Sequence, residues 1–120
     1  MIISFAGHSG ISVDDKLKMV LKEQICAAIE NEDFTTFYLG GNGEFDGLCA
    51  VVCAELKKNH DNIETVYVSP YLHEHSKIKD IQSSGLYDSL LYPPIENIPL
   101  RFAIVKRNEW MIENSDLVIV

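Results

Sequence analysis

Basic residues are scarce in this sequence. Ten lysines and arginines stand against 18 aspartates and glutamates in 120 residues, so the formal net charge is −8. Proteins that bind duplex nucleic acid normally carry clustered basic side chains that neutralise phosphates. The densest basic cluster here is only the pair Lys106 and Arg107. We therefore expect no duplex nucleic acid among the partners of this protein.

Long hydrophobic runs and cysteines are also few. No stretch approaches the ~20 apolar residues that span a bilayer, and Met1 does not open a basic region followed by a long apolar segment. The odd number of cysteines, Cys26, Cys49 and Cys53, falls in helix-like patterns, which predicts buried, reduced thiols. We expect a cytoplasmic protein without a membrane partner.

What is present is the composition of a globular protein. Hydrophobic residues make up 47% of the chain and charged residues 23%. A chain of this length buries roughly two-thirds of the surface that its unfolded form exposes, which is enough for one core. Since no linker or internal repeat divides the sequence, we expect a single domain over residues 1–120.

Strand-like and helix-like segments alternate along the first 70 residues. Strands are expected over residues 2–6, 35–39 and 63–69, and helices over 12–31 and 48–59. Ser12 is the expected cap of the first helix, with Asp14 and Asp15 in its first turn. This alternation predicts an α/β, Rossmann-like three-layer fold with a mainly parallel sheet.

The second half of the chain is less regular. Residues 70–99 are expected to form one long connection with a single short helix, followed by a helix from Pro99 to about Asn114 and a strand over 117–120. Open sheets of this class normally continue past a buried strand with another loop and helix. We therefore expect the domain to be incomplete after Val120.

Two glycine-rich loops follow the first two expected strands, at the edge of the sheet where α/β proteins bind ligands. The first contains Gly7, His8 and Ser9, whose backbone and side chains could approach an anion closely. The second has four glycines within the eight positions 40–47. An alternative is that the glycines only form the turns.

The second loop is a candidate ligand site of no common phosphate motif. Its ligand-binding candidates are Gly40, Gly41, Asn42, Gly43 and Asp46. The spacing departs from GxGxxG because Asp46 stands where the third glycine belongs, and no Lys-Ser or Lys-Thr pair follows. Glu44 and Asp46 would repel a phosphate but could accept hydrogen bonds from ribose hydroxyls or a base amine. Alternatively, they only favour the start of the helix.

An arginine interrupts the apolar stripe of the last helix. At ~100° per residue, Arg107 falls about 20° from Leu100, in line with Ala103, Ile104 and Met111. A buried guanidinium needs carboxylates, carbonyls or a ligand anion around it. Arg107 is therefore predicted either to contact a ligand or to pair internally with Glu44, Asp46 or Asp116.

Other polar residues are secondary candidates. Arg101 and Asn108 lie on the same helix and could line the ligand crevice, whereas Trp110 is expected to have a packing role. His73 and His75 lie in a polar stretch where solvation is the simpler role, so no metal or cofactor is expected. Cys49 and Cys53 share one face of a helix and are expected to be small core residues.

Four segments together resemble the SLOG superfamily, the Rossmann-like group that includes DprA and the LOG phosphoribohydrolases. They are residues 5–8, 40–46, 92–94 and 107–116. The strongest likeness is the run from Arg107 through Met111 to Ser115 and Asp116, which is similar to the LOG segment Arg-Lys-x-x-Met followed by Ser-Asp. The sequence is most similar to a branch of uncharacterised bacterial proteins within this group.

The resemblance implies a nucleotide or nucleotide-derived ligand, with Arg107 in the position of an arginine that LOG enzymes use at the nucleotide. Many members are proposed to be sensors, and this chain ends before the Pro-Gly-Gly-x-Gly-Thr motif and the glutamate that LOG enzymes carry. A sensor or regulatory module is therefore the first interpretation.

Two other interpretations remain open. One is a LOG-like nucleotide 5′-monophosphate N-glycosidase, in which Glu44 would be the catalytic carboxylate. The other is a scaffold without a ligand, whose exposed last strand recruits a partner or a second copy of the chain by extending the sheet.

Overall fold

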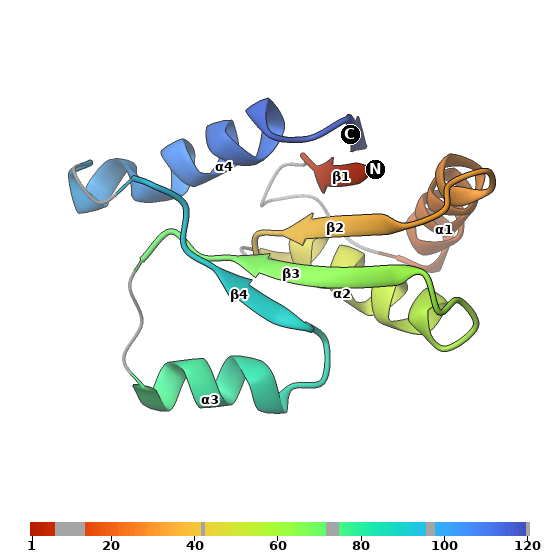
Figure 1. The fold of residues 1–120 in the computed structure, drawn as a ribbon, viewed down its shortest axis with the longest axis horizontal. Coiled ribbons are helices and arrows are strands. Elements are labelled where there is room, and N and C mark those ends of the chain that lie inside the picture. The colour runs from red at the N-terminus through yellow and green to blue at the C-terminus, as the bar shows by residue number, and fades with distance from the viewer. Residues whose placement is uncertain (7–13, 42, 72–74, 96–97, 120) are drawn as a thin grey trace.

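A five-stranded, entirely parallel sheet forms the centre of the protein (Figure 1). The computed structural model describes residues 1–6, 14–41, 43–71, 75–95 and 98–119. The strands are β1 (Ile2–Phe5), β2 (Thr35–Leu39), β3 (Ile63–Val68), β4 (Ser89–Leu91) and β5 (Leu117–Ile119). Their order across the sheet is β4-β3-β2-β1-β5. The predicted α/β, Rossmann-like class is confirmed.

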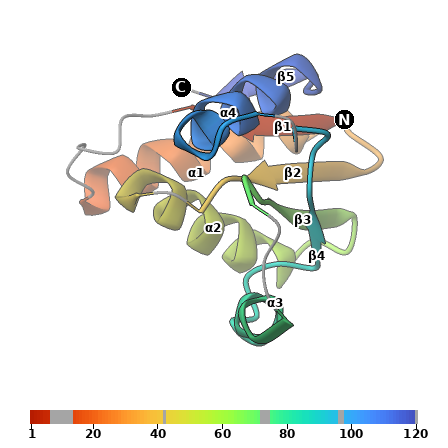
Figure 2. The same cartoon turned by 90° about the vertical axis from the view of Figure 1, so that its left-hand side faces the viewer.

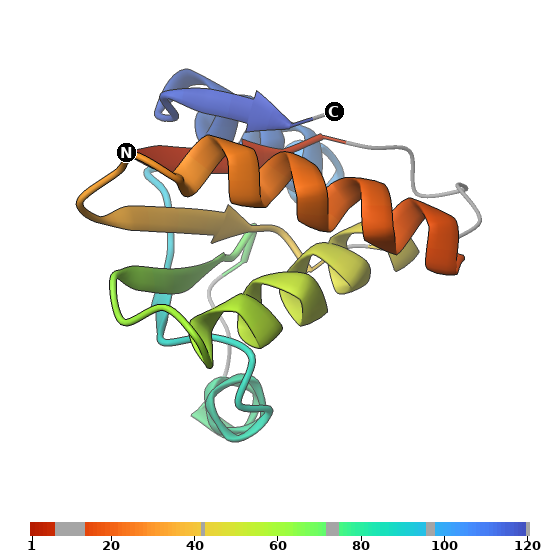
Figure 3. The same ribbon diagram turned by 90° about the vertical axis from the view of Figure 1, so that its right-hand side faces the viewer.

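Helices cover both faces of the sheet and complete the predicted three layers. The helices are α1 (Asp15–Ile29), α2 (Glu44–Lys57), α3 (His75–Ser83) and α4 (Ala103–Glu113), the last preceded by the 3-10 turn η1 (Leu100–Phe102). α1 and α2 lie on one face and α4 on the other (Figure 3). Within the described ranges, no helix is both long and apolar enough to cross a membrane.

The chain path places a topological switch point between β1 and β5. β1 to β4 step successively toward one edge of the sheet, with α3 lying beside that edge and away from α4 (Figure 2). α4 then returns the chain to the other side of β1, where the backbone N–H of Ala6 donates to the carbonyl of Ile119 at 3.0 Å. In such sheets, ligands bind outside the C-terminal ends of the strands. We therefore expect a ligand site at that edge of the sheet.

The first helix begins later than the sequence indicated. Its N-cap is Asp14, in an extended conformation, and the Asp14 carboxylate accepts a hydrogen bond of 2.8 Å from the backbone N–H of Leu17. The expected cap, Ser12, lies outside the described residues. Aspartate satisfies the free N–H groups of a first turn as well as serine does, so either residue could have been chosen from the sequence.

A fourth strand interrupts the segment that was expected to be one connection with a helix. β4 pairs with β3 over three residues, and Asp88 fixes its start by exchanging hydrogen bonds with Thr65. The Thr65 N–H donates to Asp88 Oδ2 and the Asp88 N–H donates to the Thr65 carbonyl, both at 2.8 Å. A three-residue edge strand with an exposed Ser89 has too short an apolar pattern to be recognised from sequence.

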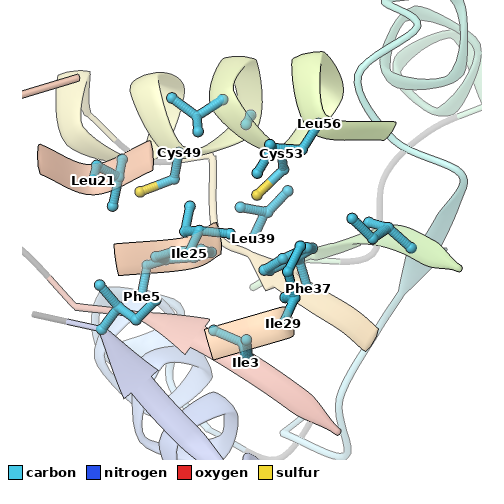
Figure 4. Close-up of a cluster of buried hydrophobic side chains, with 14 of the residues drawn as sticks. Ile3, Phe5, Leu21, Ile25, Ile29, Phe37, Leu39, Cys49, Cys53 and Leu56 are labelled. Atoms are coloured by element: carbon cyan, nitrogen blue, oxygen red, sulfur yellow. The ribbon is translucent and has the colours of Figure 1, made fainter. Parts of the chain in front are cut away.

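The main core fills the space between the sheet and the pair α1 and α2 (Figure 4). Cys49 and Cys53 are fully buried there, and burial raises the pKa of both thiols well above its ordinary range, which confirms them as core residues. Cys26 is exposed instead, contrary to expectation. It follows Ile25 by one residue and is turned about 100° away from the buried face of α1.

We expect Asp88 to stabilise the β4 edge in a pH-dependent manner. Partial burial alone would raise the pKa of Asp88, but hydrogen bonds from Lys57 and Thr65 outweigh that effect and lower it. The stabilisation is therefore complete above the unfolded-state pKa, near 3.8, and is lost as the pH falls through the lower native value.

Substitution of Asp88→Asn should lower the free energy of unfolding at pH 7 by about 1 kcal/mol and flatten its decline below about pH 4. Urea denaturation at about ten pH values between 2.5 and 7 measures both effects. The exposed Asp61→Asn serves as the charge-matched control. An Asp88→Asn profile parallel to that of the wild type would contradict the assignment.

Candidate functional site

The C-terminal ends of β2 and β3 converge on the side chain of Arg107. Its relative exposure is 0%, and its Nη1 donates to the carbonyls of Gly40 at 2.7 Å and Val68 at 2.9 Å. Gly40 directly follows β2 and Val68 ends β3. The Nε group donates to Asn108 Oδ1 at 2.8 Å. Arg107 thus joins α4 to two strand ends at the edge where the fold predicts a ligand.

The second terminal nitrogen of Arg107 is differently placed. Nη2 is buried, and no described residue accepts a hydrogen bond from it. Burial lowers the pKa of Arg107, while Asp46 is the largest influence that opposes the shift by favouring the charged form. The site therefore combines a buried cation, a nearby carboxylate and one donor without a described partner.

The burial of Arg107 is as predicted, but the predicted apolar face of the helix wrongly included Leu100. Leu100 is 75% exposed, because it lies in η1 and not in the α-helix. A 3-10 turn advances about 120° per residue, so the angular count from Leu100 does not continue into α4. The buried face of α4 is Ala103, Arg107 and Met111, at four-residue spacing.

The two glycines after β2 leave room for neighbouring side chains to pack closely against the backbone. A Cβ at Gly40 would lie 3.1 Å from Arg107 Cζ, 3.2 Å from Nη2 and 3.2 Å from Asp46 Oδ2. Gly41 has a φ of +65°, and a Cβ there would lie 2.4 Å from the ring of Tyr67. The Arg107 guanidinium and the Asp46 carboxylate therefore both lie close to Gly40, and Tyr67 packs against Gly41. This packing is a reason for glycine beyond forming the turn.

Three tyrosines interact with the groups of this site and were not among the predicted site residues. Tyr67 and Tyr87 make an edge-to-face contact with ring centroids 5.1 Å apart, and Tyr71 is one of the groups that favour the charged form of Arg107. Burial, then the proximity of Tyr67 and Asp46, raises the pKa of Tyr87 to about 12. Tyr67 could have been found from strand alternation, because it points opposite to Val66 and Val68 near the end of an expected strand.

The remaining predicted residues are only partly brought together. Gly43 is the N-cap of α2 with a φ of 93°, and Glu44 is exposed in the first turn. Asn108 is exposed and holds the Nε group of Arg107, while the guanidinium of Arg101 is exposed and stacks 4.8 Å from the centre of the Phe102 ring. The candidates outside the described residues are Gly7, His8, Ser9, Asn42 and His73.

The last part of the Arg107–Asp116 motif has a separate structural role. Asp116 Oδ2 accepts a hydrogen bond of 2.7 Å from the Ile2 N–H, and the Asp116 N–H donates to the Ile2 carbonyl at 2.8 Å. Asp116 therefore acts at the beginning of β1, at the opposite end of the strands from Gly40. Trp110 stacks on Tyr38 with ring centroids 5.6 Å apart, which confirms its expected packing role.

A metal site finds no support in the part of the chain that is described. No group of three or more His, Cys, Asp or Glu side chains there is arranged to hold a metal ion. The arrangement at Arg107 offers one donor, Nη2, without a described acceptor, together with a nearby carboxylate, which suits an organic ligand with polar groups.

Comparison with known proteins gives a distant relative. No protein-family model matches the chain. A UPF0398 protein of Halalkalibacterium halodurans is 25% identical to the chain over 94% of its residues. The chain spans 61% of the length of that relative. The relative comes from an uncharacterised family, in keeping with the predicted likeness to such bacterial proteins.

The glycine at position 41 should be required for stability, whereas the glycine at position 47 should not. Gly41→Ala places a methyl group 2.4 Å from Tyr67 at a positive φ, so we expect a loss of about 2 kcal/mol or more in the free energy of unfolding. Gly47→Ala lies within α2 with nothing near its Cβ, and should gain about 0.5 to 1 kcal/mol. Chemical denaturation compares the two, and equal effects would contradict the close packing at Gly41.

Proposed function

We propose that the protein binds a nucleotide or a nucleotide-derived ligand at the C-terminal ends of its strands, as a sensor or regulatory module. The observation that carries the proposal is Arg107, a fully buried cation at this edge whose Nη2 has no acceptor among the described residues. An unsatisfied charged donor in a protein interior is costly and commonly marks a place where another group binds.

Three further points support this proposal. Ligands of Rossmann-like sheets bind beyond the C-terminal ends of the strands. The residues there present exposed backbone at Gly41 and Gly43, and the carboxylate of Asp46 could accept hydrogen bonds from ribose hydroxyls or a base amine. The resemblance of the Gly40 loop and the Arg107 segment to the SLOG superfamily favours the same ligand class, and membership of that superfamily is part of the proposal.

A panel of nucleosides and nucleotides tests the proposal. At least one should raise the melting temperature of the wild type, because a ligand that binds only the native state stabilises it by mass action. Arg107→Ala is a poor probe on its own, since losing a buried charged partner commonly costs about 3 to 5 kcal/mol. Asn108→Ala is better, because Asn108 is exposed and orients the guanidinium through Nε.

Asn108→Ala should change the stability of the free protein by about 1 kcal/mol or less while it reduces the ligand-induced shift. Lys106→Gln is the matched control, because Lys106 is exposed, adjacent in sequence and paired with Glu109 at 3.2 Å. Free base released from a nucleoside monophosphate would instead favour the N-glycosidase interpretation. A melting temperature that no compound changes would contradict ligand binding.

The exposed edge of the sheet supports a second proposal, recruitment of another copy of the chain by sheet extension. β5 lies at the edge of the described sheet, and Leu117 within it is 38% exposed. Edge strands with apolar side chains readily pair with other strands. We expect light scattering after size exclusion to detect a dimer at high concentration, and Leu117→Lys to restore a monomer. A wild type that is monomeric at all concentrations would exclude this arrangement.

A further inference from the structure

The placement of Asp46 bears on what kind of ligand this site accepts. Asp46 lies in the first turn of α2, on the face of the sheet opposite to α4, yet its Oδ2 and Arg107 Nη2 are both 3.2 Å from the point that a Gly40 Cβ would occupy. The carboxylate and the guanidinium therefore both lie close to Gly40 at the end of β2. The cation of this site already has an internal carboxylate in its neighbourhood, which favours its charged form.

Asp46 acts electrostatically on several titratable groups of this cluster. It favours the charged form of Arg107, and it adds to burial, which is the larger cause, in raising the pKa values of Tyr67, Tyr87 and Cys49. A carboxylate with these effects adds negative potential at the strand ends. Glu44, exposed in the same helical turn, adds a second negative charge. Two carboxylates against one guanidinium oppose the binding of a dianion.

We propose that Asp46 is the internal counter-ion of Arg107, and that the site consequently selects an uncharged, nucleoside-like group over a phosphate dianion. This inference rests on the proposed function and specifies it further. Arg107 Nη2 then donates to a neutral acceptor of the ligand, such as a base carbonyl or a sugar hydroxyl oxygen. Asp46 thereby determines the specificity of the site, because it offsets the positive charge of Arg107 that would otherwise attract an anion.

Calorimetric titration of the chain with nucleosides, their 5′-monophosphates and inorganic phosphate tests this inference. The wild type should bind a nucleoside at least as tightly as its monophosphate, and inorganic phosphate weakly. Asp46→Asn removes the counter-ion while keeping the side-chain shape, so the ratio of the two affinities should shift toward the monophosphate by about tenfold. Asp33→Asn, an equal charge change at the other end of β2, should leave the ratio unchanged.

Salt dependence provides a second measurement that needs no variant. If the site repels phosphate, added salt screens the repulsion, and the affinity of the wild type for the monophosphate should rise relative to that for the nucleoside. A monophosphate affinity that exceeds the nucleoside affinity and falls with salt would overturn the inference while leaving the proposed function intact. An unchanged affinity ratio in folded Asp46→Asn would also overturn it. Failure of every compound to bind would instead contradict the proposed function itself.

Discussion

The hydrogen bonds of one buried guanidinium connect three elements that are distant in sequence. Arg107 on α4 donates to the residue after β2 and to the last residue of β3, so the helix is fixed against the C-terminal ends of the two strands. A buried ion is tolerated only where acceptors replace its water, because the cost of desolvation is several kcal/mol. The strand-end carbonyls and the nearby Asp46 carboxylate meet that requirement, and Nη2 is left as the remaining donor.

This requirement explains the composition of the loop that follows β2. A Cβ on Gly40 would lie 3.1 Å from Arg107 Cζ, and one on Gly41 would lie 2.4 Å from the Tyr67 ring. Packing therefore excludes a Cβ at Gly41 and leaves little room for one at Gly40. Asp46 lies close to the same glycine, Gly40, since α2 begins at Glu44, shortly after Gly41. The glycine loop, the first turn of α2 and the Arg107 guanidinium therefore depend on one another for their packing.

The sequence motif that begins with Arg107 acts at both ends of the sheet. Arg107 contacts the C-terminal ends of the strands, Met111 packs on β3, and Asp116 binds the backbone of Ile2 at the start of β1. Ser4 on β1 adds a buried hydrogen bond to the Met111 carbonyl at 3.2 Å. The spacing within this segment is thus explained by how α4 spans the sheet.

The sequence by itself determined the α/β class, the first three strands, both flanking helices and the burial of Arg107, because each depends on local periodicity or on glycine punctuation. It could not reveal β4, whose three residues are defined by pairing with β3 through Thr65 and Asp88. Nor could it choose among the partners of Arg107 or find Tyr87 at the site. Only the tertiary structure decided these, because contacts between residues tens of positions apart depend on how the strands are ordered in the sheet.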